Sequence, residues 1–310
     1  MSEPGLVFKT STYDKSLSGC NLRQCDFLFI GDAVDDRGEA VNTELASKAK
    51  RVVRLSFCDQ KLIVDGQDSS AKKLAGMLNA KSVVRIESTT LGLAEILRVL
   101  QAVKEAKISE LEFCYVEPKE YSNHQSMVDG ILSPREFELT TNNVFSGLQG
   151  FNNEFREDQK ASHVFFLGYE SSRLQQALEQ RGEFPASGYH RYFVIGVPAF
   201  SPGWETNVLA NHVTILERLG ESSAIRYCAA NSISEAYLLL WDLYRSIGSE
   251  ESIFWVSPFG TKPHTVATAL FLLETKGSLA NSSLFYDHPV RTGKRSKEVS
   301  KFHFVTISGL

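Results

Sequence analysis

The sequence predicts an α/β protein made of two tandem Rossmann-like units, each with a parallel sheet, related by an internal duplication with pseudo-two-fold symmetry. Short apolar runs typical of buried strands alternate with helical runs along most of the chain, which indicates parallel sheets wrapped by helices. Residues 93–118 also match residues 233–258 without gaps, at an offset of 140 positions and with six identities in 26 positions. The alternative is two unrelated α/β segments that share only their order of strands and helices.

The first unit is expected over residues 23–120, after a polar and irregular segment at residues 1–22. Its strands are short apolar runs, and glycine or proline ends several of them. The expected strands are Phe27–Gly31, Val52–Phe57, Val83–Glu87 and Leu111–Val116, and the expected helices are a run ending near Lys50, then Ser69–Leu78 and Leu93–Ala106.

The second unit is expected over residues 161–310, with residues 121–160 as a polar connecting segment. It repeats the order of the first unit and ends in two further strands. The expected strands are Val164–Gly168, Tyr192–Val197, Ile225–Cys228, Ile253–Val256, Ser283–Tyr286 and Phe302–Ile307, and the expected helices include Asn207–Leu219, Ile233–Ile247 and His264–Glu274.

Composition excludes several classes of protein. A net charge of −4 over 310 residues gives no general attraction to nucleic acid, so any such binding would have to be local. The five cysteines form no C-x-x-C pair, and we expect no metal site and no cofactor. No run approaches 18 apolar residues, and the N-terminus has no apolar signal region. We therefore expect a cytoplasmic protein that does not associate with membranes.

Charged side chains follow the first strand of each predicted unit. Asp36 and Arg37 come after Gly31, and Glu170 and Arg173 come after Gly168. The arginines are suited to bind a phosphate or carboxylate through two parallel hydrogen bonds, which makes all four charged residues candidates for ligand binding. The alternative is that the acids after Gly31, which are Asp32, Asp35 and Asp36, and Glu170 after Gly168 cap a helix and interact with its dipole.

A second candidate site is the turn Gly260–Thr261–Lys262, between a buried strand and an apolar helix. A glycine turn that begins a helix presents unpaired N–H groups and the positive end of the helix dipole, and lysine and threonine add donors for an anion. The alternative is that Gly260 only makes the turn and Lys262 is solvated. Basic residues also gather at 291–301, which predicts either a solvated loop or a local site for an anion or nucleic acid.

The strand followed by Gly260–Thr261–Lys262 and a helix resembles the Gly-Thr-Lys signature of CRISPR-associated Rossmann-fold domains, which sense cyclic oligonucleotides as dimers. Two such units in one chain are similar to the SAVED sensors of bacterial anti-phage systems. The matching sequence covers about ten residues, 257–266, and Phe259 stands where the family pattern usually has a second glycine. The resemblance implies a nucleotide ligand at Gly260, Thr261 and Lys262, and no effector domain is visible in the sequence.

Three functions remain open from the sequence. The first is a sensor or accessory protein, for example of an anti-phage defence system, that works with a separate effector protein. It would bind a nucleotide or another phosphorylated small molecule in a cleft between the two units. The second is an enzyme on such a ligand that uses Asp35, Asp36 or Glu170 as acid or base, or holds Mg²⁺ through Asp32, Asp35 and Asp36. The third is a structural subunit of a defence complex.

Overall fold

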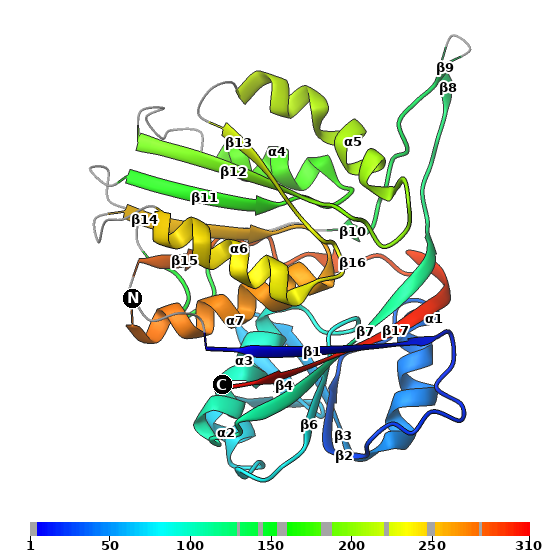
Figure 1. The fold of residues 1–310 in the computed structure, drawn as a ribbon, viewed down its shortest axis with the longest axis vertical. Coiled ribbons are helices and arrows are strands. Elements are labelled where there is room, and N and C mark those ends of the chain that lie inside the picture. Colours follow the sequence, from blue (N-terminus) through cyan, green and yellow to red (C-terminus); the bar gives the residue numbers. More distant parts are fainter. Residues whose placement is uncertain are drawn as a thin grey trace. The chain divides into compact units, whose positions relative to one another are not determined.

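The computed structural model describes residues 5–128, 131–141, 145–153, 160–180, 188–219, 223–246, 252–278 and 281–310. The chain divides into two compact units, which we call unit 1 (residues 1–122 and 291–310) and unit 2 (residues 123–290). Both units are α/β, as the sequence predicts (Figure 1). Of the expected connecting segment 121–160, residues 129–130, 142–144 and 154–159 lie outside the described residues.

Unit 1 is built on an eight-stranded mixed sheet. Its strands are β1 (Val7–Asp14), β2 (Cys25–Ile30), β3 (Ala49–Cys58), β4 (Lys61–Val64), β5 (Gln67–Ser69), β6 (Val84–Glu87), β7 (Glu110–Tyr121) and β17 (Ser296–Ser308). They lie in the order β1-β17-β7-β6-β2-β3-β4-β5. The central strands β7, β6, β2 and β3 are parallel, and the strands at both edges pair in the antiparallel sense.

The helices of unit 1 lie on both faces of this sheet. They are α1 (Asp36–Ala40), which continues through a π-helical turn (Val41–Leu45) and a 3-10 turn (Ala46–Lys48), then α2 (Ala71–Ala75) and α3 (Leu93–Glu105). The helix α1 begins after Asp35 because this carboxylate accepts a hydrogen bond from Gly38 N. The helix α2 packs against α3. The chain crosses the sheet in one direction from β2 to β3 and in the other from β3 to β6 and β7, so the general rule of right-handed crossovers puts α1 on one face and α2 and α3 on the other.

Unit 2 is built on a five-stranded sheet that is parallel throughout. Its strands are β11 (Lys160–Phe166), β12 (Tyr189–Gly196), β13 (Ser223–Cys228), β14 (Ser252–Pro258) and β15 (Ser282–Leu284), in the order β13-β12-β11-β14-β15. Numbered along the chain this order is 3-2-1-4-5, which is the order of a Rossmann sheet. Short strands lie outside it: β8 (Met127–Val128), β9 (Ile131–Leu132), β10 (Thr140–Thr141) and β16 (Val290–Arg291).

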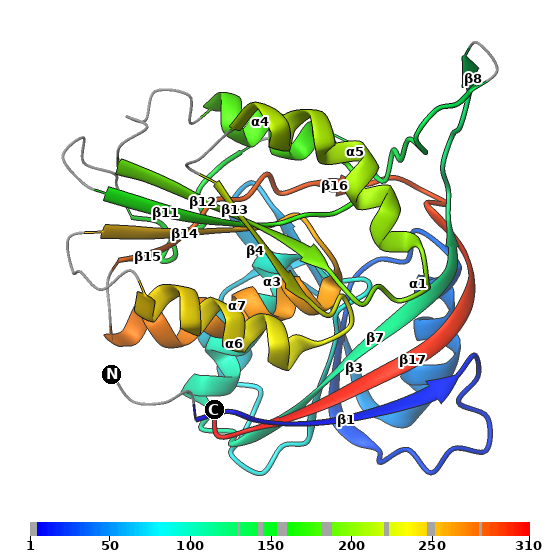
Figure 2. The ribbon, with the colours of Figure 1, turned by 45° about the horizontal axis from the view of Figure 1, so that its top comes forward.

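Two pairs of helices cover the sheet of unit 2. Figure 2 shows α4 (Ser171–Gln180) and α5 (Trp204–Leu219) on one face, with α6 (Ile233–Ser246) and α7 (Lys262–Ser278) on the other. The helix α6 starts after Ser232, whose hydroxyl accepts from Glu235 N while the Glu235 carboxylate accepts from Ala229 N. No helix in the described residues of either unit is long and apolar enough to cross a membrane.

The strand orders of the two units differ, so the sheets do not confirm an internal duplication. The four parallel strands of unit 1 follow the order 2-1-3-4 along the chain, whereas the first four of unit 2 follow 3-2-1-4. The matched segments 93–118 and 233–258 end in β7 and β14, but β7 lies beside β6 and β14 lies beside β11. A local match specifies a helix and a strand. The crossover alone decides which neighbour that strand pairs with.

Both ends of the chain also differ from expectation. Residues 1–22 were expected to be irregular, yet β1 pairs with β17 from Val7↔Ser308 to Asp14↔Lys301. Residues 291–310 were expected in the second unit and belong to unit 1 instead. The strand β1 is exposed along most of its length and lacks apolar alternation, so its sequence does not predict a strand. Its pairing with β17 defines it.

Candidate functional site

The turn Gly260–Lys262 lies at the carboxyl end of β14 and begins α7, where the sequence places it. The Thr261 hydroxyl donates to Ala230 O at 2.6 Å, and Thr261 O accepts from Thr265 N at 3.1 Å, which forms the first helical turn. Lys262 is half-buried and is the first residue of the helix. The N-terminus of a 17-residue helix therefore lies at the strand ends where open α/β sheets bind ligands.

Two glycines are required where β11 and β14 end side by side. A Cβ on Gly168 would lie 2.3 Å from the backbone oxygen of Phe259. A Cβ on Gly260 would lie 2.7 Å from Nδ1 of His264 and 3.2 Å from the backbone oxygen of Leu167. Close approach of two loops therefore explains both glycines, independently of any ligand.

His264 is a buried core histidine on the first turn of α7. Its Nε2 lies 3.2 Å from Ala229 O and 3.5 Å from Cys228 Sγ, and the ring packs against Phe166. Burial lowers the pKa of His264 to about 4, so the ring is neutral near pH 7. Because the side chain is fully buried, it is not placed to act as a general base.

Arg173 is buried and its donors contact groups of the protein itself, whereas the sequence predicts that it binds a ligand. Its Nε and Nη2 each donate to one oxygen of Asp287 at 2.6 Å, and Nη1 donates to Phe259 O at 3.3 Å. The guanidinium carbon lies 4.8 Å from the centre of the Phe259 ring. Arg173 therefore neutralises a buried aspartate and fixes the loop that leads to Gly260.

Glu170 is also used within unit 2. One of its carboxylate oxygens accepts from Leu139 N at 2.9 Å and from Thr140 N at 3.0 Å, and the Thr140 hydroxyl lies 3.1 Å from both oxygens. Burial raises the pKa of Glu170 against the opposing effects of Arg173 and these hydrogen bonds. The residue anchors the segment before β10, which leaves it poorly placed to contact a ligand.

In unit 1 the two ligand candidates Asp36 and Arg37 contact different partners. Arg37 is 1% exposed and donates to Asp35 Oδ2 from Nε at 3.2 Å and from Nη2 at 2.7 Å. Asp36 is exposed and accepts from Glu298 N at 2.8 Å. The helix-cap alternative is thus confirmed for Asp35, and Arg37 reaches it from within the first turn.

The acids after β2 do not assemble a metal site. No group of three or more His, Cys, Asp or Glu side chains in the described part of the chain could hold a metal ion. Asp35 is committed to Arg37, and the Ser296 hydroxyl donates to the same oxygen at 2.7 Å. The Mg²⁺ site considered for Asp32, Asp35 and Asp36 is therefore not supported.

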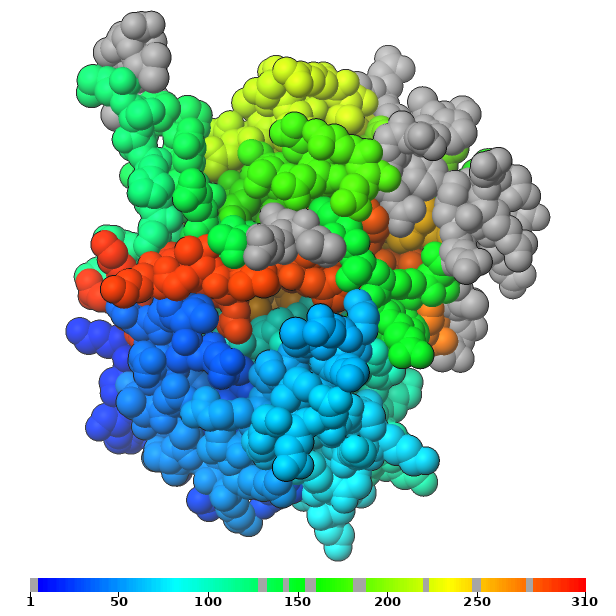
Figure 3. Space-filling model, turned by 180° about the vertical axis from the view of Figure 1, so that it is seen from behind, coloured from blue at the N-terminus to red at the C-terminus, as the bar shows by residue number. Residues whose placement is uncertain are grey.

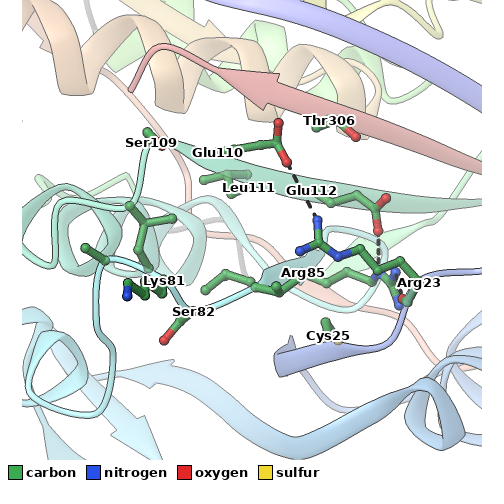
Figure 4. Close-up of a pocket in the computed structure, with 14 residues that line it drawn as sticks. Arg23, Cys25, Lys81, Ser82, Arg85, Ser109, Glu110, Leu111, Glu112 and Thr306 are labelled. Carbon is green, nitrogen blue, oxygen red and sulfur yellow. Dashed lines mark hydrogen bonds and ion pairs between the residues drawn. The ribbon is translucent and has the colours of Figure 1, made fainter.

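A cavity of about 240 Å³ lies at the amino ends of β6 and β7 in unit 1 (Figure 4). Figure 4 shows Arg85 directed at Glu112 and Arg23 directed at Glu110, the second pair 4.0 Å apart. Lys81 adds a third cation, and Nη1 of Arg85 is buried without a partner in the described chain. The positive and negative side chains that line the cavity nearly balance. The cavity also lies at the amino ends of the strands, whereas the predicted sites lie at the carboxyl ends, so we assign no function to it.

Sequence reasoning missed Asp287, which decides the role of Arg173. Its position directly after the expected strand Ser283–Tyr286 was the available signal, because strand ends collect polar side chains that face a sheet edge. It also named Arg295 only as part of a basic loop. The structure turns this arginine toward Asp35, 3.6 Å away.

Comparisons with known proteins add no family to this geometry. No protein-family model matches the chain, and no curated protein matches it in sequence.

Proposed function

We propose that the chain binds a nucleotide or another phosphate-bearing small molecule in unit 2, with Gly260, Thr261 and Lys262 holding the phosphate. The observation that carries this proposal is the position of the turn. It joins the fourth strand of a parallel 3-2-1-4-5 sheet to the N-terminus of a 17-residue helix. In such a position the helix dipole, first-turn N–H groups and a lysine ammonium act on an anion together.

The resemblance to nucleotide sensors of prokaryotic antiviral systems extends this proposal. Under this hypothesis the chain is a sensor or accessory protein whose bound ligand alters the activity of a separate effector. The enzyme alternative receives less support, because Asp35 and Glu170 already accept hydrogen bonds from buried or half-buried donors of the protein. Asp36 accepts one from Glu298 N. Neither Asp35 nor Glu170 is available as an acid or base without breaking those contacts.

The decisive variant is Lys262→Glu, which replaces attraction of a phosphate with repulsion. Calorimetric titration with nucleoside mono- and triphosphates and cyclic oligonucleotides should show binding to the wild type that weakens at least tenfold in the variant. Lys160→Glu is the matched control, because Lys160 is exposed and lies at the opposite, amino end of β11. Lys276 is less suitable, since its Nζ donates to Asn153 Oδ1 at 3.0 Å.

Equal affinity in the wild type and Lys262→Glu would show that the turn does not contact the ligand. Equal loss in Lys262→Glu and Lys160→Glu would show a general effect of charge on the protein.

A further inference from the structure

Residues 291–295 form a loop across the carboxyl ends of the parallel strands in unit 1. Lys294 N donates to Val34 O, after β2, at 2.7 Å. Arg291 Nη1 donates to Thr89 O, after β6, at 3.1 Å. Figure 3 shows the C-terminal segment, in red, lying against the blue N-terminal residues of the same unit. The loop thus spans β2 and β6, between which the strand order of unit 1 changes direction, and ligands bind at this point in open α/β sheets.

This loop brings Arg295 to the buried pair of Arg37 and Asp35, and it places Arg291 near Arg295. Arg295 Nε lies 3.6 Å from Asp35 Oδ2, the same oxygen that accepts from Arg37. Burial, and then repulsion from Arg37 and Arg291, lowers the pKa of Arg295 to about 10 from its ordinary value of 12.5. We call Arg37, Arg291 and Arg295 the arginine cluster.

The cluster has fewer negative partners than positive charges. Asp35 is the carboxylate that contacts it within the described residues, and the Ser296 hydroxyl and Gly38 N also donate to this side chain. The next acid along the strand ends, Glu87, accepts instead from Thr89 N, Thr90 N and the Thr90 hydroxyl. Arg37 and Arg295 both contact this one carboxylate, and Arg291 is close enough to Arg295 to repel it, so the three guanidinium groups carry two positive charges more than Asp35 neutralises.

One donor of the arginine cluster and one donor beside it also lack acceptors among the described residues. Nε of Arg295 is buried and has no hydrogen-bond partner among the described residues, because its distance to Asp35 is too long for one. The hydroxyl oxygen of Thr292, in the same loop, is likewise buried without a partner. Buried polar atoms are nearly always hydrogen-bonded in proteins, so two such atoms in one loop indicate a missing acceptor.

We propose that Arg291, Arg295 and Thr292 bind the phosphate group of a small ligand at the carboxyl end of the unit 1 sheet, with Arg37 supplying positive charge behind them. A phosphate carries close to two negative charges at neutral pH, which matches the excess charge of the cluster, and its oxygens accept from guanidinium and hydroxyl donors. Lys297 and Lys301 do not take part, because they are exposed on β17. This site lies in unit 1 and does not depend on the turn Gly260–Lys262 of unit 2.

The test is a titration of the full chain with inorganic phosphate, a nucleoside monophosphate and the matching nucleoside. The wild type should bind the first two and not the nucleoside, and Arg295→Gln should weaken phosphate binding about ten- to a hundredfold. Tighter binding of the monophosphate than of inorganic phosphate assigns the site to an esterified ligand, and the reverse assigns it to free phosphate. Without ligand, Arg295→Gln should melt no lower than the wild type, because it removes repulsion inside the cluster.

Lys297→Gln is the control, since it removes one charge from an exposed side chain two residues away. Arg291→Gln, at a half-buried position, serves as the second variant if Arg295→Gln fails to fold. Absence of phosphate binding by the wild type at 10 mM phosphate, roughly the weakest affinity such a site would have, or equal weakening in Lys297→Gln, would overturn the proposal. Loss of phosphate binding in Lys262→Glu but not in Arg295→Gln would also overturn it, while supporting the site in unit 2.

Discussion

Units 1 and 2 each bury an arginine in the helix after their first parallel strand, but they neutralise its charge differently. Arg173 in unit 2 meets both oxygens of Asp287 at 2.6 Å. Arg37 in unit 1 meets a single oxygen of Asp35, which also accepts from Ser296 and lies near Arg295. Aromatic rings lie under both guanidinium groups, Phe259 in unit 2 and Tyr121 in unit 1.

Because two arginines at equivalent positions are neutralised differently, position in the fold does not decide the role of a buried arginine. A guanidinium paired with its own carboxylate has its charge neutralised and attracts an anion only weakly, so Arg173 is structural. A carboxylate shared among several donors leaves positive charge around it, so the region of Arg37 is suited to an anion. The comparison therefore predicts a structural defect when the pair in unit 2 is broken and a binding defect when the cluster in unit 1 is reduced.

The largest effect is expected from breaking the pair in unit 2. Asp287→Asn leaves the charge of Arg173 buried without a counterion and should lower the free energy of unfolding by roughly 3–5 kcal/mol. Adding Arg173→Met should recover much of this loss, because no buried charge then remains. Chemical denaturation would measure both, with Asp242→Asn on the exposed side of α6 as the control. A loss below about 1 kcal/mol in Asp287→Asn would show that Arg173 is not a structural residue.

A smaller effect is expected from the glycines that let neighbouring strand ends approach. Gly168→Ala in unit 2 places a Cβ 2.3 Å from Phe259 O, and Gly31→Ala in unit 1 places one 2.2 Å from Thr90 O. Each should cost about 1–3 kcal/mol of stability, because the obstructing atom is backbone and cannot rotate away. Gly188→Ala meets no atom within 4 Å and should be neutral. Thermal melting would sharpen the comparison, since equal losses would mean that both units depend on the same close approach.

The last expected effect appears only at acid pH. Burial acts to raise the pKa of Asp35. The attraction of Arg37 and the hydrogen bonds from Arg37 and Ser296 outweigh this effect and lower the pKa from 3.8 to about 2. A lowered pKa means that the charged pair stabilises the fold above about pH 4 and that this contribution is lost as the pH falls toward 2. The contribution is about 2 kcal/mol. Stability measured from pH 5 to pH 2 should therefore fall more steeply in the wild type than in Asp35→Asn, and identical slopes would contradict the pairing.

Parts of the candidate site were predictable because their signals are local. The turn Gly260–Lys262 was placed at the start of a helix from a buried strand, a glycine and an apolar run that follow one another directly. Asp35 as a helix cap was an explicit alternative, and the contact with Gly38 N confirms it. The partners of Arg173 and Arg295 were not predictable, because Asp287 and Asp35 lie more than 100 residues away from them in the sequence.

The α/β class and the central strands of both sheets follow from the sequence alone, since apolar periodicity indicates burial one segment at a time. Tertiary structure alone decided the strand orders, the pairing of β1 with β17 and the assignment of residues 291–310 to unit 1. It also decided which charges cancel. Coulomb interactions depend on the distance between charges and on their burial. The crossovers between strands determine this distance and this burial, and no periodic sequence pattern indicates which residues a crossover brings together.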